Sequence, residues 1–374
     1  MKTDRHLLAD KDAVAESHTL STTEKNQALW QTYQDKKSQS PMLFPTEGAK
    51  LLGVSEFELL LSSPDSRYLG TKCREMLFEL EAFGVLESIV RNQFAVHEKQ
   101  GEYKNLKIGD VMGLAINVGK LDLRIFMKKW AHMLAVKNVG KNTSYSIQFF
   151  DSYGQAINKA FLTETSEASI AKWQALAERY GKDAPSTISL NKIVPQSAWQ
   201  YHQLSTEQKQ AFGEDWQAMT DIHQFHGILG KYELDRASSY HQAPAGTTIA
   251  VKPPVIEALF NRLRDDKVGC MIFVGNTGMV QIETGLTHHV KRMGDWLNIL
   301  DKQERGFSLH LKDSALTQVW HIERPSSDGK ITAFEAFDDK GNSIITIFGV
   351  RTEGQVQCPK WQQLTQELAK EFAA

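Results

Sequence analysis

The sequence contains few cysteines and no long apolar run. Its three cysteines, Cys73, Cys270 and Cys358, lie far apart, and none belongs to a C-x-x-C pair. A cysteine zinc site and a disulfide framework are therefore not expected. Nowhere do about 18 apolar residues follow one another, and residues 1–18 interleave acids with bases instead of forming a signal peptide. We expect a cytoplasmic protein with reduced thiols that does not insert into a membrane.

An excess of charge of either sign is also absent. The formal net charge is -2 and the isoelectric point is near 6.6, so no global field attracts nucleic acid or an anionic membrane. Any anion site must then be a local cluster of basic side chains. With 41% hydrophobic and 24% charged residues, the chain has the composition of a folded globular protein. Its 374 residues suffice for two domains, or for one large domain of two similar halves.

The residue patterns divide the chain into four parts. Residues 1–22 are polar and weakly patterned, which indicates a flexible tail. Helical periodicity followed by short alternating strands fills 23–185, and we take this segment as an N-terminal repeat. A polar, proline-containing connection, 186–205, is the candidate linker, and 206–374 forms a C-terminal repeat. The expected fold class is α+β, with helices beside an antiparallel sheet in each half.

The second half repeats motifs of the first in the same order and at nearly the same offset. The segment 150–157, with the pattern F-D-x-x-G-x-x-I, matches 337–344, and LDLRIF at 121–126 aligns with FSLHLK at 307–312. A single duplication of this length predicts two similar halves, not a solenoid of short units. A chance match is the alternative, because F-D-x-x-G is also a common hairpin pattern.

Segment 214–236 carries the candidate metal ligand. On a continuous helix, Trp216, Met219, His223 and His226 fall on one face, because they are spaced by three or four residues. An imidazole among large apolar and sulfur side chains suits iron held in a flat porphyrin. The other interpretation is a hydrogen-bonded structural histidine, which is the commoner case.

Motifs along the whole chain favour the first interpretation. MTDIHQFH, IFVGNTGMVQIETG, WLNIL, RPSSDG and FGVRTEG in the second half, with RNQFAVHE, LDLRIF and SIQFFD in the first, resemble the hemin-degrading factor family. This is the HemS and ChuS type of bacterial heme-utilisation protein, and the resemblance runs from about residue 25 to the C-terminus. It implies a tandem duplication, each half a large antiparallel sheet flanked by helices, with heme bound between the halves.

The resemblance also implies residue roles. His223, the histidine of M-T-D-x-H, is the expected axial ligand of the heme iron, and Arg124 lies over the opposite heme face with Phe126 nearby. Arg124 stays protonated, so it leaves the sixth iron position open to a water or an oxygen-derived ligand. Guanidinium groups bind carboxylates through charge-assisted, often bidentate bonds. Three arginines match positions that line the heme site and meet its propionates: Arg236, Arg324 and Arg351.

The sequence departs from the family pattern at three positions. His226 replaces the last aromatic residue of H-Q-F-F and either supports the ligand without binding the iron or is an alternative ligand. Arg324 stands where lysine is expected, which conserves the charge. Phe348 stands where tyrosine is common, so a hydroxyl hydrogen bond is lost.

Two further patterns carry no predicted chemistry. Gly275-Asn276-Thr277-Gly278 lies between two strand-like runs and indicates a hairpin turn, not a phosphate-binding loop. His288 and His289 are adjacent, and on a strand they would point to opposite faces, so joint metal binding is not expected.

The resulting functional prediction is a heme-binding protein that opens the porphyrin and releases iron. No flavin or nicotinamide motif is visible, so an external reductant must supply the electrons. The alternative is a non-catalytic carrier that stores heme and transfers it to a separate heme oxygenase. Expected partners are heme, an inner-membrane heme importer as donor, and a reductase or heme oxygenase as acceptor. A duplicated structural module without a cofactor is the third interpretation.

Overall fold

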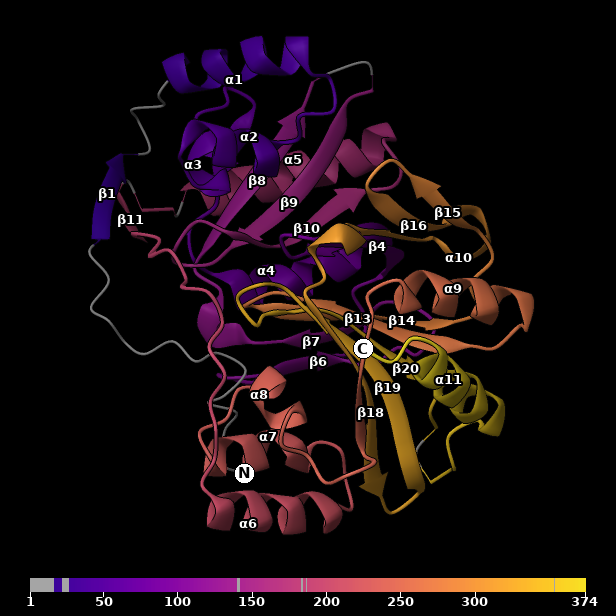
Figure 1. The fold of residues 1–374 in the computed structure, drawn as a ribbon. Coiled ribbons are helices and arrows are strands. Elements are labelled where there is room, and N and C mark those ends of the chain that lie inside the picture. Colours follow the sequence, from indigo (N-terminus) through magenta and orange to yellow (C-terminus); the bar gives the residue numbers. More distant parts are fainter. Residues whose placement is uncertain (1–16, 22–26, 140–141, 183, 186, 353) are drawn as a thin grey trace.

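The structure, a computed structural model, consists of two nine-stranded antiparallel sheets with helices packed on them (Figure 1). It describes residues 17–21, 27–139, 142–182, 184–185, 187–352 and 354–374. The first sheet has the strand order β15 (Val290–Met293), β16 (Trp296–Asp301), β17 (Phe307–Leu311), β4 (Ala95–Glu102), β3 (Val85–Arg91), β10 (Ala156–Leu162), β9 (Ser144–Phe150), β8 (His132–Asn138) and β2 (Ser66–Tyr68). The second has the order β12 (Thr248–Val251), β18 (Gln318–Ser326), β19 (Gly329–Phe337), β20 (Ser343–Gly349), β13 (Cys270–Gly275), β14 (Met279–Gly285), β7 (Asp122–Ile125), β6 (Gly113–Ala115) and β5 (Leu106–Ile108). The predicted α+β class is confirmed.

Each half of the chain gives three strands to the sheet of the other half. Strands β15, β16 and β17 of the second half join the first sheet, where β17 pairs with β4. Strands β5, β6 and β7 of the first half join the second sheet, where β7 pairs with β14. The sequence predicted one sheet in each half but not this exchange. Its consequence is that Arg124, a residue of the first half, belongs to the second sheet.

The duplication is confirmed by strand order and by matching turns. Read from opposite ends, the two sheets run through equivalent strands, with β4, β3 and β10 corresponding to β14, β13 and β20. In the first half the Asp151 carboxylate accepts backbone N–H groups two and four residues later, and Asp338 does the same in the second. Gly154 and Gly341 both have positive φ, 75° and 77°, which favours glycine. A chance match does not produce the same turn twice.

Two segments predicted as tail and linker form strands. Ser17–Ser21 (β1) pairs antiparallel with Thr187–Asn191 (β11) in a separate two-stranded sheet. Ile188 and Leu190 alternate with polar residues and are fully buried against the first half. The prediction of a flexible tail is therefore wrong for residues 17–21, and residues 1–16 lie outside the described residues.

The helices cover the sheets in equivalent positions. Clusters of three short helices begin each half, and single helices precede and follow the strands. Amphipathic sequence explains the packing: α9 turns Val255, Leu259, Phe260 and Leu263 into the core. None of the described helices has the length and apolar character needed to cross a membrane. The helices are α1 (Gln27–Gln39), α2 (Pro45–Leu52), α3 (Glu56–Leu61), α4 (Cys73–Glu79), α5 (Glu167–Lys182), α6 (Thr206–Gln217), α7 (Gln224–Lys231), α8 (Arg236–Tyr240), α9 (Val255–Asp265), α10 (Lys302–Arg305) and α11 (Pro359–Glu371).

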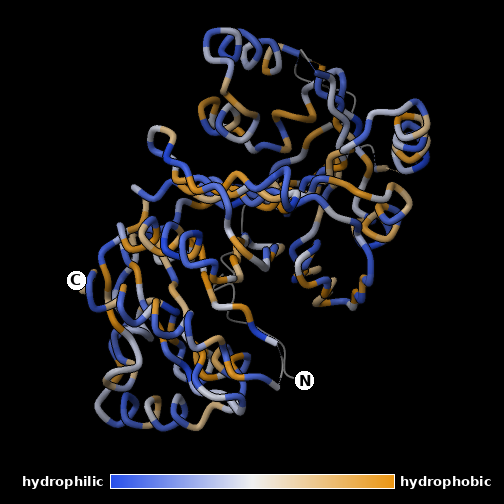
Figure 2. Tube along the Cα trace, turned by 90° about the vertical axis from the view of Figure 1, so that its right-hand side faces the viewer, coloured by the Kyte–Doolittle hydropathy of each residue, from blue (hydrophilic) through white to orange (hydrophobic). Residues whose placement is uncertain are grey.

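The strands alternate between a buried and a less buried face. Figure 2 shows apolar stretches interleaved with hydrophilic ones along the sheets instead of gathered in one band. Strand β13 is an example: Cys270, Ile272 and Val274 are buried, whereas Met271 and Phe273 are only half-buried. Alternation of this kind is typical of strands with one face in the core.

A buried ion cluster links the two sheets. Lys99 on β4 lies 2.7 Å from Glu283 on β14, and both side chains are almost fully buried. Arg305, the last residue of α10, lies 2.6 Å from the other oxygen of the same carboxylate. The Lys99 ammonium also donates to the Arg305 carbonyl at 2.9 Å. These charges hold β4, β14 and α10 together.

Removing one charge of this cluster is expected to destabilise the fold. Lys99→Ala leaves the buried Glu283 carboxylate with one cation, and it should lower the free energy of unfolding by about 3 kcal/mol. Lys330→Ala, which removes a more exposed partner of Glu323, serves as the control and should change it by less than about 1 kcal/mol. Urea denaturation followed by circular dichroism measures both, and equal effects of the two variants would contradict the prediction.

Candidate functional site

The segment carrying His223 is not one continuous helix. Helix α6 ends at Gln217 and α7 begins at Gln224, with His223 as its N-cap residue. The Gln224 side chain accepts the N–H groups of Thr220 and Asp221, and these local bonds compete with helix continuation. The prediction that Trp216 and His223 share a helix face is therefore wrong: Trp216 is fully buried, while the His223 side chain is 80% exposed.

Asp221 fixes the orientation of the His223 ring. Nδ1 of His223 donates to Oδ1 of Asp221 at 2.7 Å, and the His223 backbone N–H donates to the same oxygen at 2.8 Å. The backbone hydrogen bond from His223 is the largest of the interactions that lower the pKa of Asp221, and the charge of Arg351 adds to them. Because Nδ1 is occupied, Nε2 is the nitrogen left for a ligand.

Arg236 and Arg324 are both linked to the buried Glu335 carboxylate, Arg324 through the Tyr240 hydroxyl. The Arg324 guanidinium lies 3.9 Å from the ring centroid of Phe225 and donates to the Tyr240 hydroxyl at 2.5 Å. That hydroxyl donates to Glu335 at 2.5 Å, and Nε of Arg236 lies 3.2 Å from the other Glu335 oxygen. Burial raises the pKa of Tyr240 to about 12, so the hydroxyl stays protonated. Two guanidinium groups thus share one negative charge.

The arginine cluster has unused hydrogen-bond donors. Buried Nε atoms of Arg324 and Arg351 have no hydrogen-bond acceptor among the described residues, whereas Nε of Arg236 is paired with Glu335. Burial, helped by the charges of Arg236 and Arg324, lowers the pKa of His226 to about 3, so this histidine is neutral. Buried donors without acceptors are costly, and here they indicate that an anionic ligand completes the site.

Arg124 lies on the face of the second sheet that also carries this cluster. Residues opposite each other on paired strands share a face, as do residues two apart on one strand. One rung runs from β7 to β18 through residues opposite one another: Asp122, Ile282, Phe273, Thr346, Glu335 and Trp320. Arg124 is two residues beyond Asp122, and Arg324 is four beyond Trp320. The rung therefore places both arginines on the face that packs against α6 and α7.

The strands between Arg124 and the arginine cluster present half-buried apolar side chains. Met271, Phe273, Val280 and Phe348 occupy this face, and the rings of Phe273 and Phe348 meet edge-on at 5.2 Å. The alternation of buried and half-buried residues in MIFVG at 271–275 is the sequence signal for this apolar surface. We did not predict the surface as part of the site. A flat apolar macrocycle matches such a surface.

The predicted residues form one group with two outlying members. His223, His226, Arg236, Arg324 and Arg351 gather where α7 meets the β18–β19 hairpin, whose Ser327 N–H donates to the Thr220 carbonyl. The hydrogen bonds and ion pair described for the Arg124 side chain go to Asp122 and the Leu123 carbonyl, and Phe126 is anchored by its N–H to Gly278. In the view of Figure 1, β6 and β7 lie above α7 and α8.

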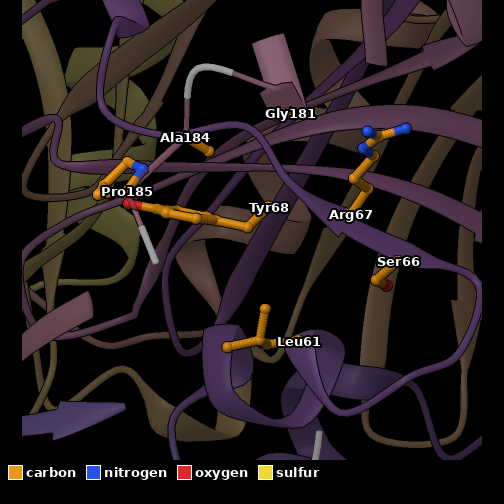
Figure 3. A pocket seen from close by; sticks show the side chains of 7 residues that line it. All are labelled: Leu61, Ser66, Arg67, Tyr68, Gly181, Ala184 and Pro185. Atoms are coloured by element: carbon orange, nitrogen blue, oxygen red, sulfur yellow. The ribbon is translucent and has the colours of Figure 1, made fainter. Parts of the chain in front are cut away.

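A small cavity lies elsewhere among the described residues, and none of the predicted residues lines it. It lies where β2 approaches the end of α5 and measures about 170 Å³ (Figure 3). Its lining consists of Leu61, Ser66, Arg67, Tyr68, Gly181, Ala184 and Pro185. Pockets for small molecules usually hold about 300–1,000 Å³, so this cavity is too small for a porphyrin. The candidate site is the open face of the second sheet.

Comparison with known proteins agrees with this geometry. The profile of the haemin-degrading HemS.ChuX domain matches residues 53–180 and 233–368. The chain belongs to the HemS/ChuX family. The hemin transport protein HmuS of Yersinia pestis is 32% identical over 93% of this chain and 100% of its own length. The hemin transport protein HemS of Yersinia enterocolitica is also 32% identical, over 90% of this chain and 96% of its own.

Solved structures extend the family likeness to the whole fold. Holo-PhuS, a heme-binding protein of Pseudomonas aeruginosa, superposes with a TM-score of 0.83, 32% identity, and coverage of 93% of this chain and 99% of its own. ChuS, described as an E. coli heme oxygenase, gives a TM-score of 0.78, 30% identity, and coverage of 91% and 99%. The tandem fold of the HemS/ChuX family is therefore present along nearly the whole chain.

Tyr240 bridges Arg324 and Glu335, so its hydroxyl should stabilise the site. Tyr240→Phe is expected to lower the free energy of unfolding by about 1.5–3 kcal/mol, because two bonds to charged groups are lost. Tyr201→Phe is the matched control, since Tyr201 is exposed and no hydrogen bond is described for its hydroxyl. Thermal or urea unfolding measures both variants; an unchanged Tyr240→Phe protein would show that the bridge adds no stability.

Proposed function

We propose that this protein binds heme on the open face of the second sheet, with His223 as the axial ligand of the iron. The observation that carries the proposal is the cluster of buried guanidinium groups with unused donors beside an exposed imidazole whose Nε2 is free. Propionates are carboxylates and suit Arg236, Arg324 and Arg351. The match to proteins named for hemin transport and heme binding supports the same ligand.

In this proposal, each side chain of the site has its own role in binding heme. Asp221 holds the proton on Nδ1 of His223, which keeps Nε2 available and makes the imidazole a stronger donor. Arg124 faces the ligand from the opposite side, stays charged and donates hydrogen bonds there. Phe126 lies next to Arg124, and Phe273 and Phe348 supply apolar surface. Because Arg124 comes from the first half and His223 from the second, the heme lies between contributions of both halves.

The leading chemical proposal is oxidative opening of the bound porphyrin and release of iron. Bound heme would supply a redox-active iron, dioxygen would be the oxidant and the source of the oxygen atoms, and an external reductant would supply electrons to activate the dioxygen. The Arg124 side chain is partly exposed, which leaves access for small molecules on its side of the site. The structure described as an E. coli heme oxygenase supports this proposal. The proposal of heme degradation includes a cytoplasmic location, an importer as heme donor and a separate reductase.

A carrier is the second candidate, and two observations favour it. The curated relatives are named hemin transport proteins, and His223 lies on an exposed helix end where a ligand is easily exchanged. His226, half-buried one turn beyond and neutral, offers an alternative nitrogen during such an exchange. In this case heme passes unchanged to a separate heme oxygenase.

An absorption titration of the apo-protein with hemin tests the axial ligand. Wild type should saturate at one equivalent with a shifted Soret band, and His223→Ala should shift the band and weaken binding at least about tenfold, because the imidazole–iron bond is lost. His241→Ala, a histidine of the same half whose ring packs on Trp199 and Trp320, is the control. A His223→Ala spectrum identical to wild type moves the ligand elsewhere, with His226 the first to test.

A turnover assay separates degradation from transport. Loaded protein with excess reductant, and with catalase to remove free peroxide, should lose its Soret band and release one iron for each heme. Arg124→Ala should retain heme but slow this loss about 100-fold, because a preorganised donor is removed. Lys128→Ala, a nearby exposed cation, is the control. Intact heme in the wild type, with full transfer to an apo-acceptor, would favour the carrier.

A further inference from the structure

A second cluster of metal-binding groups lies at the far edge of the first sheet. His289, Asp301 and Glu304 each offer one ligand atom, and these atoms lie within 4.8 Å of one another. Nε2 of His289 is 2.9 Å from a Glu304 oxygen. His289 precedes β15, Asp301 ends β16, and Glu304 lies in α10, so strand pairing brings together groups that are separated in sequence.

The backbone holds these groups in place. Asp301 is fully buried, and its two oxygens accept the backbone N–H groups of His288 and His289 at 2.9 and 2.8 Å. The N–H of Leu300 donates to the His289 carbonyl at 2.9 Å, which ties the loop to the end of β16. Each carboxylate oxygen can accept more than one bond, so Asp301 retains the capacity to bind a cation.

The charge of this cluster is not balanced. Among the ion pairs of the described residues, none joins Asp301 to a lysine or arginine. Its buried carboxylate accepts backbone N–H groups and lies near the His289–Glu304 pair, and its charge also raises the pKa of Glu283. A buried carboxylate normally needs a cation, and the neighbouring Glu283 has two, Lys99 and Arg305. Asp301, like the buried Asp338, has no lysine or arginine partner among the described ion pairs, but Asp301 also has an imidazole and a second carboxylate within ligand distance.

We propose that His289, Asp301 and Glu304 form a site for a divalent transition-metal ion of the zinc class. One imidazole and two carboxylates suit such an ion better than Ca²⁺ or Mg²⁺, which prefer oxygen ligands alone. Three protein ligands leave room for water at the metal. The expectation that His288 and His289 lie on a strand is wrong, because both lie in the loop before β15. The site is independent of the proposed heme site.

Titration of the apo-protein with Co²⁺ and Zn²⁺ tests this site. Co²⁺ absorption reports inner-sphere imidazole ligation, and Zn²⁺ calorimetry gives affinity and stoichiometry. His289→Gln and Glu304→Gln, two surface changes expected to leave the fold intact, should each lose the site or weaken it at least about tenfold. Asp301→Asn also removes a structural anchor, so the test does not depend on it.

His18→Gln is the matched control. His18 pairs with Glu58 at 3.0 Å, an exposed His–Glu pair without the third ligand. It should bind Co²⁺ like wild type, and His223→Ala should retain this site whether or not it binds hemin. Equal Co²⁺ spectra and Zn²⁺ stoichiometry in wild type, His289→Gln and Glu304→Gln would overturn the proposal. So would a wild-type protein that binds neither ion.

Discussion

The pairing of β7 with β14 is the constraint on which the candidate site depends. It joins a strand of the first half to the sheet of the second, so Arg124 and Arg324 become residues of one face. Without this pairing, Arg124 would not share a sheet with Arg324. The buried contact of Lys99 with Glu283 acts on the same strand, because it connects β14 to β4 of the first sheet. Site geometry and overall stability therefore rest on the same region.

Near His223, local side-chain hydrogen bonds prevent α6 from continuing into α7. Helix periodicity would continue α6 through His223, but Gln224 and Asp221 side chains satisfy the backbone groups that a helix would use. The chain turns, and the imidazole points outward instead of packing beside Trp216. The same Asp221 then orients the ring. A break in a helix thus separates the residues that build the core from the residue that is free to bind a ligand.

Sequence patterns predicted the fold class and the internal duplication, because motifs such as F-D-x-x-G encode a turn whose hydrogen bonds are local. They did not predict the strand exchange, since the residue patterns of β7 and β14 do not indicate with which strand each one pairs. Family motifs predicted His223 and the arginines as site residues, and the structure gathers His226, Arg236, Arg324 and Arg351 around His223. Tyr240 and Glu335 were missed, because a buried hydroxyl and carboxylate become informative only when their partners are known.

The exchange of strands also has a consequence for how the chain folds during synthesis. When the first half has emerged from the ribosome, strand β4 still has an open edge, because β17 lies some two hundred residues later. An unpaired strand edge is a site for association with other chains. Strands β5 to β7, meanwhile, have no sheet to join until β14 is made. Such distant pairing slows folding, so release of the complete chain is the step that closes both sheets.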